Sequence, residues 1–249
     1  MNFLAMRLFP AVWRAWSGLF SAALLVAVWH FPQPCAAQTA PSTADFSDSG
    51  VFEILSGQHR IGTESFRIRP DGPRWEVSGE LQLEPSGGGK VSVVSKLELD
   101  SALRPVSYLR EQKSPKAGKL AVQFGSPETN LVSSAGTGDP LEQVFYLPST
   151  DLAVLDTNFF HHYALLLRLY DSARGGAQPF NVFVPQEALP GAIQLELMGK
   201  ESVSTGGQSR ELNHYRAVTE QLQIELWATP EGAIYRLAIP QADLEVVRR

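Results

Sequence analysis

The chain has 249 residues, of which 44% are apolar, 10% aromatic and 19% charged, the composition of an ordinary globular domain. Its formal net charge is −5, which disfavours binding to nucleic acid through broad neutralisation of phosphates. The single cysteine excludes a disulfide scaffold and a thiolate cage for zinc or an iron–sulfur cluster. No nucleophile elbow, phosphate-binding loop or dinucleotide fingerprint occurs, so we expect no cofactor and assign no catalytic residue.

Residues 1–37 have the pattern of a cleaved secretory signal peptide. Arg7 and Arg14 precede an apolar run of 11 residues, 18–28, and small residues lead up to a cleavage point after Ala37. The apolar run is shorter than the roughly 20 residues that span a bilayer, which disfavours the alternative of an uncleaved anchor. We therefore predict export to the periplasm or cell envelope, with no membrane span after cleavage.

Residues 38–49 are small and polar and are interpreted as a flexible leader, so 50–249 are expected to form one domain. Apolar and polar residues then alternate strictly in several runs, at 74–84, 90–99, 193–197 and 222–226. Such alternation indicates antiparallel strands with one buried face. We count about eleven strands, too many for a flat sheet because strand twist accumulates. The predicted fold is mainly β, a single strongly curved antiparallel sheet that forms a half-barrel.

One segment departs from this period. Apolar side chains between 155 and 173 follow helical spacing, and they predict one buried helix that covers the concave face of the sheet. On this helix Phe159 and Tyr163 share the buried side, whereas His161 is placed toward solvent and His162 at the edge of the core face. Adjacent histidines point about 100° apart on a helix, so no metal ion is expected between them.

Aromatic residues are the candidate ligand contacts. A curved sheet closed by one helix can leave a cavity whose aromatic walls suit an apolar ligand. The candidates on predicted inner positions are Phe66, Trp75, Tyr108, Phe159 and Tyr163, for which plain core packing is the alternative interpretation. Trp227 lies on the polar side of its strand and is expected to be exposed or covered by a loop, which makes it a candidate contact residue.

Two segments carry a resemblance to a known group of proteins. Arg60-Ile61-Gly62-Thr63 opens the second strand, and Ile224-Glu-Leu-Trp-Ala-Thr-Pro-Glu-Gly232 is followed by a strand that carries Arg236. With the signal peptide, this layout resembles uncharacterised exported bacterial proteins that are similar in fold to the outer-membrane lipoprotein carriers. The resemblance implies a half-barrel of about eleven strands, and the carriers hold acyl chains on its concave side. This chain departs from the carriers in having one predicted helix and no lipidated cysteine.

These observations favour an exported, non-enzymatic binding module for an apolar ligand or a protein segment. The expected partners are an apolar small molecule, a lipid or an envelope protein. One alternative is an envelope structural or assembly factor with a filled core, acting through surfaces such as that of Trp227. Another is a hydrolase that uses His161 or His162 with a nearby carboxylate; such a site requires an imidazole and a carboxylate within hydrogen-bond distance inside a cleft.

Overall fold

The computed structural model describes residues 46–84, 89–114, 116–136, 138–205 and 207–249. The predicted signal peptide and most of the predicted leader lie outside these residues, so both stay predictions. The described part contains one α-helix, α1 (His162–Leu169), and two short 3₁₀ helices, η2 (Pro185–Glu187) and η3 (Pro240–Ala242). The strands are β1 (Asp48–Ser56), β2 (His59–Asp71), β3 (Arg74–Leu83), β4 (Val91–Leu99), β5 (Pro105–Ser114), β6 (Gly118–Gln123), β7 (Thr129–Ala135), β8 (Leu141–Phe145), β9 (Leu152–Val154), β10 (Gln178–Val184), β11 (Leu189–Thr205), β12 (Gln208–Val218), β13 (Gln223–Ala228), β14 (Ile234–Ile239) and β15 (Leu244–Arg248).

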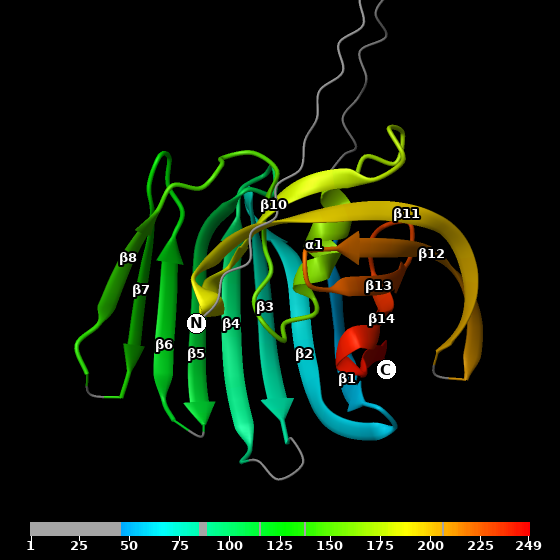
Figure 1. Cartoon of the computed structure of the whole chain (residues 1–249), viewed down its shortest axis with the longest axis horizontal. Helices are drawn as coiled ribbons and strands as arrows, with labels where there is room; N and C mark the ends of the chain where they lie inside the picture. Colours follow the sequence, from blue (N-terminus) through cyan, green and yellow to red (C-terminus); the bar gives the residue numbers. More distant parts are fainter. Residues whose placement is uncertain (1–45, 85–88, 115, 137, 206) are drawn as a thin grey trace, which may run out of the picture. The chain divides into compact units, whose positions relative to one another are not determined.

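All fifteen strands belong to one sheet, whose order is β8-β7-β6-β5-β4-β3-β2-β1-β15-β14-β13-β12-β11-β10-β9 (Figure 1). Every neighbouring pair is antiparallel except β9 and β10, which run parallel. The sheet is curved but does not close into a barrel: its two end strands, β8 and β9, are not hydrogen-bonded to each other. The predicted fold class, a single curved sheet with one helix, is confirmed. The described residues contain fifteen strands rather than about eleven, and 105–145 supplies four of them.

The strict alternation of the sequence explains the strands that position the interior. Along β3 the residues from Trp75 to Leu81 alternate between fully buried and more accessible, and the buried set faces the concave side. Gly72 joins β2 to β3 with φ of +59°, a left-handed conformation that glycine adopts without steric cost. This glycine therefore allows the short connection between Asp71 and Arg74.

The helix is much shorter than the predicted 155–173. Leu155 still belongs to strand pairing, because its N–H donates to the carbonyl of Phe183 at 3.0 Å. Asn158 then adopts φ of +68°, which no right-handed helix contains. At the other end Tyr170 is extended, with ψ of 124°. An irregular segment, residues 155–161, thus takes the place of the first two predicted helical turns.

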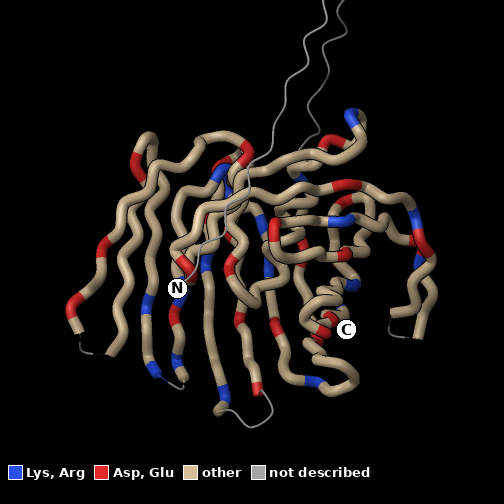
Figure 2. The backbone as a smooth tube through the Cα atoms, viewed as in Figure 1, with Lys and Arg blue, Asp and Glu red and all other residues tan. Residues whose placement is uncertain are grey.

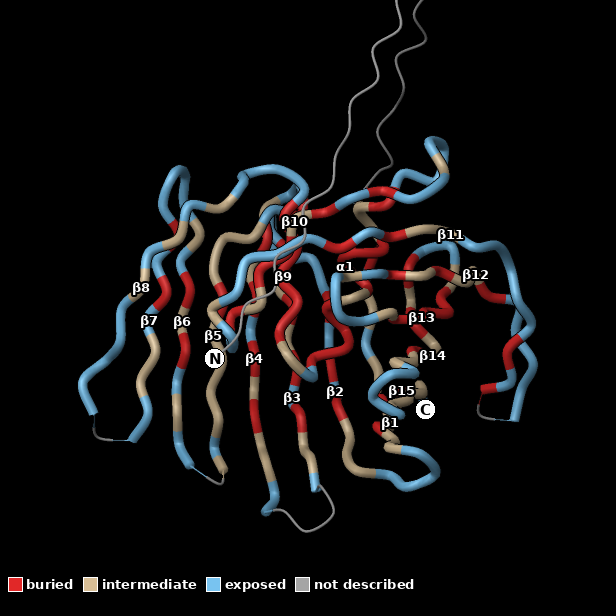
Figure 3. Tube along the Cα trace, in the orientation of Figure 1, coloured by how far each residue is buried: buried red, intermediate tan, exposed pale blue. Residues whose placement is uncertain are grey.

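The core lies inside the curve of the sheet. Buried residues occupy the middle of β2–β5, α1 and β9–β10, whereas the tips of the hairpins and β8 are exposed (Figure 3). The curvature brings Phe145 of β8 within 5.0 Å of Phe183 of β10, measured between ring centroids. Acidic and basic residues are interspersed over the strands without a block of one sign (Figure 2). In the described residues no helix has the length and apolarity needed to cross a membrane.

Candidate functional site

A cavity of about 620 Å³ opens on the concave side, next to segment 155–161. This volume lies within the range of about 300–1,000 Å³ typical of small-molecule sites. Its walls come from that segment, from β10 and the start of β11, from the β12–β13 turn and from the η3–β15 region. Most of the lining side chains are apolar: Leu155, Phe159, Phe160, Val182, Val184, Leu189, Ile193, Leu222, Ile224, Ile239 and Leu244. The cavity therefore has mainly apolar walls.

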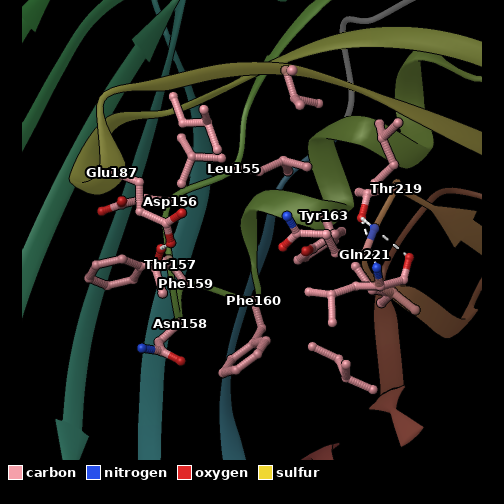
Figure 4. Close-up of a pocket in the computed structure, with 18 of the residues that line it drawn as sticks. Leu155, Asp156, Thr157, Asn158, Phe159, Phe160, Tyr163, Glu187, Thr219 and Gln221 are labelled. Carbon is pink, nitrogen blue, oxygen red and sulfur yellow. Dashed lines mark hydrogen bonds between the residues drawn. The ribbon is translucent and has the colours of Figure 1, made fainter. Parts of the chain in front are cut away.

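The polar groups of the cavity gather on two sides (Figure 4). Asp156, Thr157, Asn158 and Glu187 line one side, and the turn 219–221 lines the other. The Thr157 hydroxyl donates to Glu187 Oε1 at 2.8 Å. Tyr163, in α1, lies between the two sides, and burial raises its pKa to about 12, so the phenol keeps its proton at neutral pH.

A buried carboxyl beneath the cavity holds segment 155–161 against the sheet. Glu64 of β2 is fully buried, and its two oxygens accept the backbone N–H groups of Phe160 at 2.9 Å and His161 at 3.3 Å. The same carboxyl contacts Nδ1 of the His161 side chain. The backbone N–H groups at the start of a helix have no partner within the helix, and Glu64 accepts hydrogen bonds from two of them. Burial raises the pKa of Glu64 to about 8 and lowers that of His161 to about 3.

A second buried carboxyl joins the same segment to β5. The Tyr108 hydroxyl donates to Asp156 Oδ2 at 2.5 Å, and the N–H of Gln186 donates to Oδ1 at 3.0 Å. Arg110 Nε lies 3.3 Å from Oδ2 and supplies the opposite charge. Burial outweighs these contacts and raises the pKa of Asp156. The carboxyl is fully engaged, so it acts as an anchor of the cavity wall.

The hydrogen bonding of His162 fixes its tautomer. The backbone N–H of Asp156 donates to His162 Nδ1 at 3.2 Å, so the proton of the neutral ring lies on Nε2. Burial and the adjacent His161 lower the pKa of His162 far below its ordinary value, which keeps the ring neutral. A protonated Nε2 is not a metal ligand. Among the described residues no group of three or more His, Cys, Asp or Glu side chains is placed to hold a metal ion.

The placement of His161 toward solvent was wrong. Both His161 and His162 are completely buried, and their ring centroids lie 4.5 Å apart. A helical wheel assigns directions only within a helix, and α1 begins after His161. The His161–Glu64 pair has the geometry of an acid–base pair, but neither residue lines the cavity. Substrate in the cavity therefore has no direct access to it.

The aromatic residues predicted from the sequence to contact a ligand do not all line the cavity. Phe159 and Tyr163 line the cavity. Phe66 stacks on His161 with ring centroids 5.6 Å apart, Trp75 packs 6.4 Å from Phe46, and Tyr108 is bound to Asp156. These three residues are buried core, outside the cavity lining. The ligand contacts proposed for all of them stay predictions.

Trp227 lies on the opposite face of the sheet from the cavity. It is only 8% exposed, so the expectation of an exposed or loop-covered side chain was wrong. Its ring stacks on His214 with centroids 4.7 Å apart, and the Arg236 guanidinium lies 4.7 Å from its centre on a neighbouring strand. The indole N–H donates to Glu201 at 2.6 Å. Side chains of adjacent strands, rather than a loop, cover this tryptophan.

Two residues of the buried cluster could have been found from the sequence. Glu64 occupies the same strand parity as the inner residues Phe66 and Ile68, so an acidic residue interrupts an apolar face. Gly79 similarly stands among the alternate, inward-facing residues of β3, between Trp75 and Leu81, where it leaves a position without a side chain. A Cβ at Gly79 would lie 2.6 Å from His161 Cε1, so this glycine makes room for the histidine.

The chain is similar in structure to two solved proteins. The β-barrel-like protein of domain of unknown function DUF1849 from Brucella abortus superposes with a TM-score of 0.56 and 7% identity, over 81% of this chain and 94% of that chain. A DUF1089 family protein from Pseudomonas aeruginosa gives a TM-score of 0.41 and 13% identity over 72% and 90%. No protein-family model matches the sequence, and no curated protein matches it. The first likeness supports a β-barrel-like fold, and neither confirms the resemblance to lipoprotein carriers.

Proposed function

We propose that this protein is an exported, non-enzymatic binding module that holds an apolar or amphiphilic ligand in the cavity beside segment 155–161. The observation that carries the proposal is an open cavity with apolar walls. Two of its lining residues, Leu189 and Leu222, are 51% and 39% exposed, so apolar surface faces water at the mouth. Covering such surface with a ligand releases the free energy of apolar burial.

The open cavity favours this proposal over a structural factor with a filled core. The burial of the His161–Glu64 pair disfavours the hydrolase, because a general base must reach the proton that it removes.

Export is proposed from the pattern of residues 1–37. It predicts a mature N-terminus at Gln38, which Edman sequencing of the native protein would identify; an intact Met1 would contradict it.

The binding proposal is tested by occluding the cavity. Gly191 of β11 lines the cavity, is exposed and pairs with the cavity residue Val182, so Gly191→Trp should fill the entrance; a Cβ there meets Val182 at an ordinary 3.5 Å. We expect at least a tenfold loss of affinity for N-phenylnaphthylamine, an uncharged apolar dye, measured by fluorescence titration. Gly118→Trp is the matched control, since Gly118 is a strand glycine outside the cavity whose Cβ position is likewise uncrowded. Unchanged dye binding in Gly191→Trp, or none in the unsubstituted protein, would contradict the proposal.

A further inference from the structure

The charges of the cavity lining have a single sign. Its acidic side chains are Asp156, Glu187 and Glu220, and no lysine, arginine or histidine is present among the described residues that form it. The balance is local, because both signs are dispersed over the rest of the sheet (Figure 2). The carboxylate of an alkyl acid would meet no cation here.

Two of the three carboxylates are free to meet a ligand. Asp156 is committed to Tyr108, Arg110 and the backbone of Gln186. Glu187 and Glu220 are exposed, and neither forms an ion pair with any described residue. Glu187 accepts one hydrogen bond, from Thr157, which leaves its second oxygen available.

The mouth repeats one arrangement on its two sides. Glu187 is followed two residues later by Leu189, and Glu220 is followed two residues later by Leu222. All four side chains line the same cavity, and both leucines are exposed there. In Figure 4, Glu187 lies on one side of the cavity, whereas Thr219 and Gln221, the neighbours of Glu220, lie on the other. Each side of the mouth therefore pairs an acidic group with an apolar one.

This pairing matches an amphiphile whose charge is positive. An alkyl chain gains free energy from the apolar walls in proportion to the area that it buries. A cationic head held at the mouth stays hydrated and lies near two carboxylates, whereas an anionic head in the same position would be repelled. Exposed ion pairs contribute little each, so the two glutamates select the head group rather than supply the affinity.

We propose that the cavity takes a cationic amphiphile, an alkyl chain that carries an ammonium head group at the mouth between Glu187 and Glu220. The inference rests on the proposed binding function and specifies its ligand class. The aromatic rings of Phe160 and Tyr163 line the cavity and would add cation–π attraction to a head group that enters more deeply.

Three ligands with the same chain test this inference: dodecyltrimethylammonium, dodecyl maltoside and dodecanoate. Each is titrated calorimetrically into the purified protein at pH 7, below its micelle concentration. We expect the cation to bind about fivefold or more tightly than the anion, with the uncharged maltoside between them. Raising the salt concentration should reduce this ratio, because exposed charges are screened.

The double variant Glu187→Gln with Glu220→Gln should bring the ratio of cation to anion affinity close to one, with the affinity for dodecyl maltoside unchanged. Glu128→Gln with Glu142→Gln is the matched control. Both of its sites are exposed glutamates outside the cavity, and the change in net charge is the same. The control should keep the preference.

The outcomes separate the two proposals. Equal binding of all three ligands, or a preference for dodecanoate, would overturn the head-group inference and leave the cavity function standing. A preference for the cation that persists in the Glu187 and Glu220 double variant would also overturn it. Absence of binding by all three ligands would overturn the proposed function itself.

Discussion

Glu64 and His161 together hold one proton over a wide pH range in the folded protein. The pKa of Glu64 is raised to about 8 and that of His161 is lowered to about 3, in both cases chiefly by burial. Between these values the pair carries one proton and no net charge, whichever of the two groups holds it. A net charge of either sign would be costly in an interior without solvent.

The pair and His162 should give the stability a maximum near pH 6.5. Above pH 6.5 the two histidines of the unfolded chain lose their remaining protons and its Glu64 is already ionised, whereas the folded pair keeps one proton, so stability falls as the pH rises toward 8. Below pH 6.5 the unfolded chain binds more protons, because both histidines are charged there and His162 stays neutral when folded. Stability therefore also falls as the pH decreases.

Glu64→Gln should remove the decline above pH 6.5. The amide reproduces the shape of the protonated carboxyl, and its oxygen can accept the N–H groups of Phe160 and His161. Urea unfolding at pH 6.5 and 8.0 should show a loss of at most about 2 kcal/mol in the unsubstituted protein and no loss in the variant. The variant should instead gain slightly, because its buried histidines stay neutral while those of the unfolded chain lose their remaining protons. Glu128→Gln, at an exposed position, should behave like the unsubstituted protein. An equal decline in Glu64→Gln would show that another group causes it.

At the scale of elements, the close approach of segment 155–161 to β3 depends on one missing side chain. A Cβ at Gly79 would lie 2.6 Å from His161 Cε1 and 3.0 Å from Phe159 Cδ1. Both rings are fixed, His161 by Glu64 and Phe159 by its packing on His162. The segment cannot yield locally, so an added methyl group must shift it away from the sheet.

We therefore expect Gly79→Ala to reduce the free energy of unfolding by about 1–3 kcal/mol, the usual cost of overpacking. Because Phe159 also lines the cavity, the affinity for N-phenylnaphthylamine should change as well. Gly89→Ala is the control, since no atom of the described residues lies within 4 Å of a Cβ there, and its free energy of unfolding should stay within about 0.5 kcal/mol of the unsubstituted protein. Urea denaturation of both variants measures the difference. Equal stability of the two would contradict the close packing at Gly79.

The sequence predicts the strands better than the segment that covers them. Alternation specifies β3 and β4 because each strand has one buried and one accessible face. Residues 152–156 are buried on every side, so their periodicity carries no directional information. Helical spacing there could not reveal that Asn158 turns left-handed or that Glu64, 96 residues from Phe160, replaces the missing helical hydrogen bonds. These contacts are tertiary and leave no local pattern.

The candidate site was predictable only in its general position. The expectation of an apolar cavity on the concave side follows from sheet curvature, and two of its candidate residues, Phe159 and Tyr163, line the cavity of the structure, whereas their contact with a ligand stays a prediction. The mouth, however, is formed by the β10–β11 and β12–β13 connections, which the antiparallel order β13-β12-β11-β10 places at the same end of the sheet. The two Glu-x-Leu segments, 187–189 and 220–222, are 33 positions apart in the sequence and are brought to one end of the sheet by strand pairing, which no local pattern reveals.

At the scale of the whole sheet, its two edges differ in accessibility. β9 is three residues long and entirely buried. β8 presents Leu141 and Val144, which are 59% and 52% exposed, and Glu142 is its one charged residue. Natural edge strands are commonly protected by charged side chains, lysine above all, and by proline, because an open row of N–H and C=O groups can pair with another chain. β8 is therefore the part of the described sheet that favours association between molecules.

Val144→Lys should suppress this association without changing the fold. The side chain is exposed, so the free energy of unfolding should change by less than about 0.5 kcal/mol, whereas heat-induced aggregation, followed by light scattering, should begin at a higher temperature. Val132→Lys is the matched control. Val132 is 37% exposed and the substitution adds the same charge, but its strand, β7, is paired on both sides. If both variants delay aggregation equally, net charge rather than the open edge controls it; a clear advantage of Val144→Lys assigns the effect to β8.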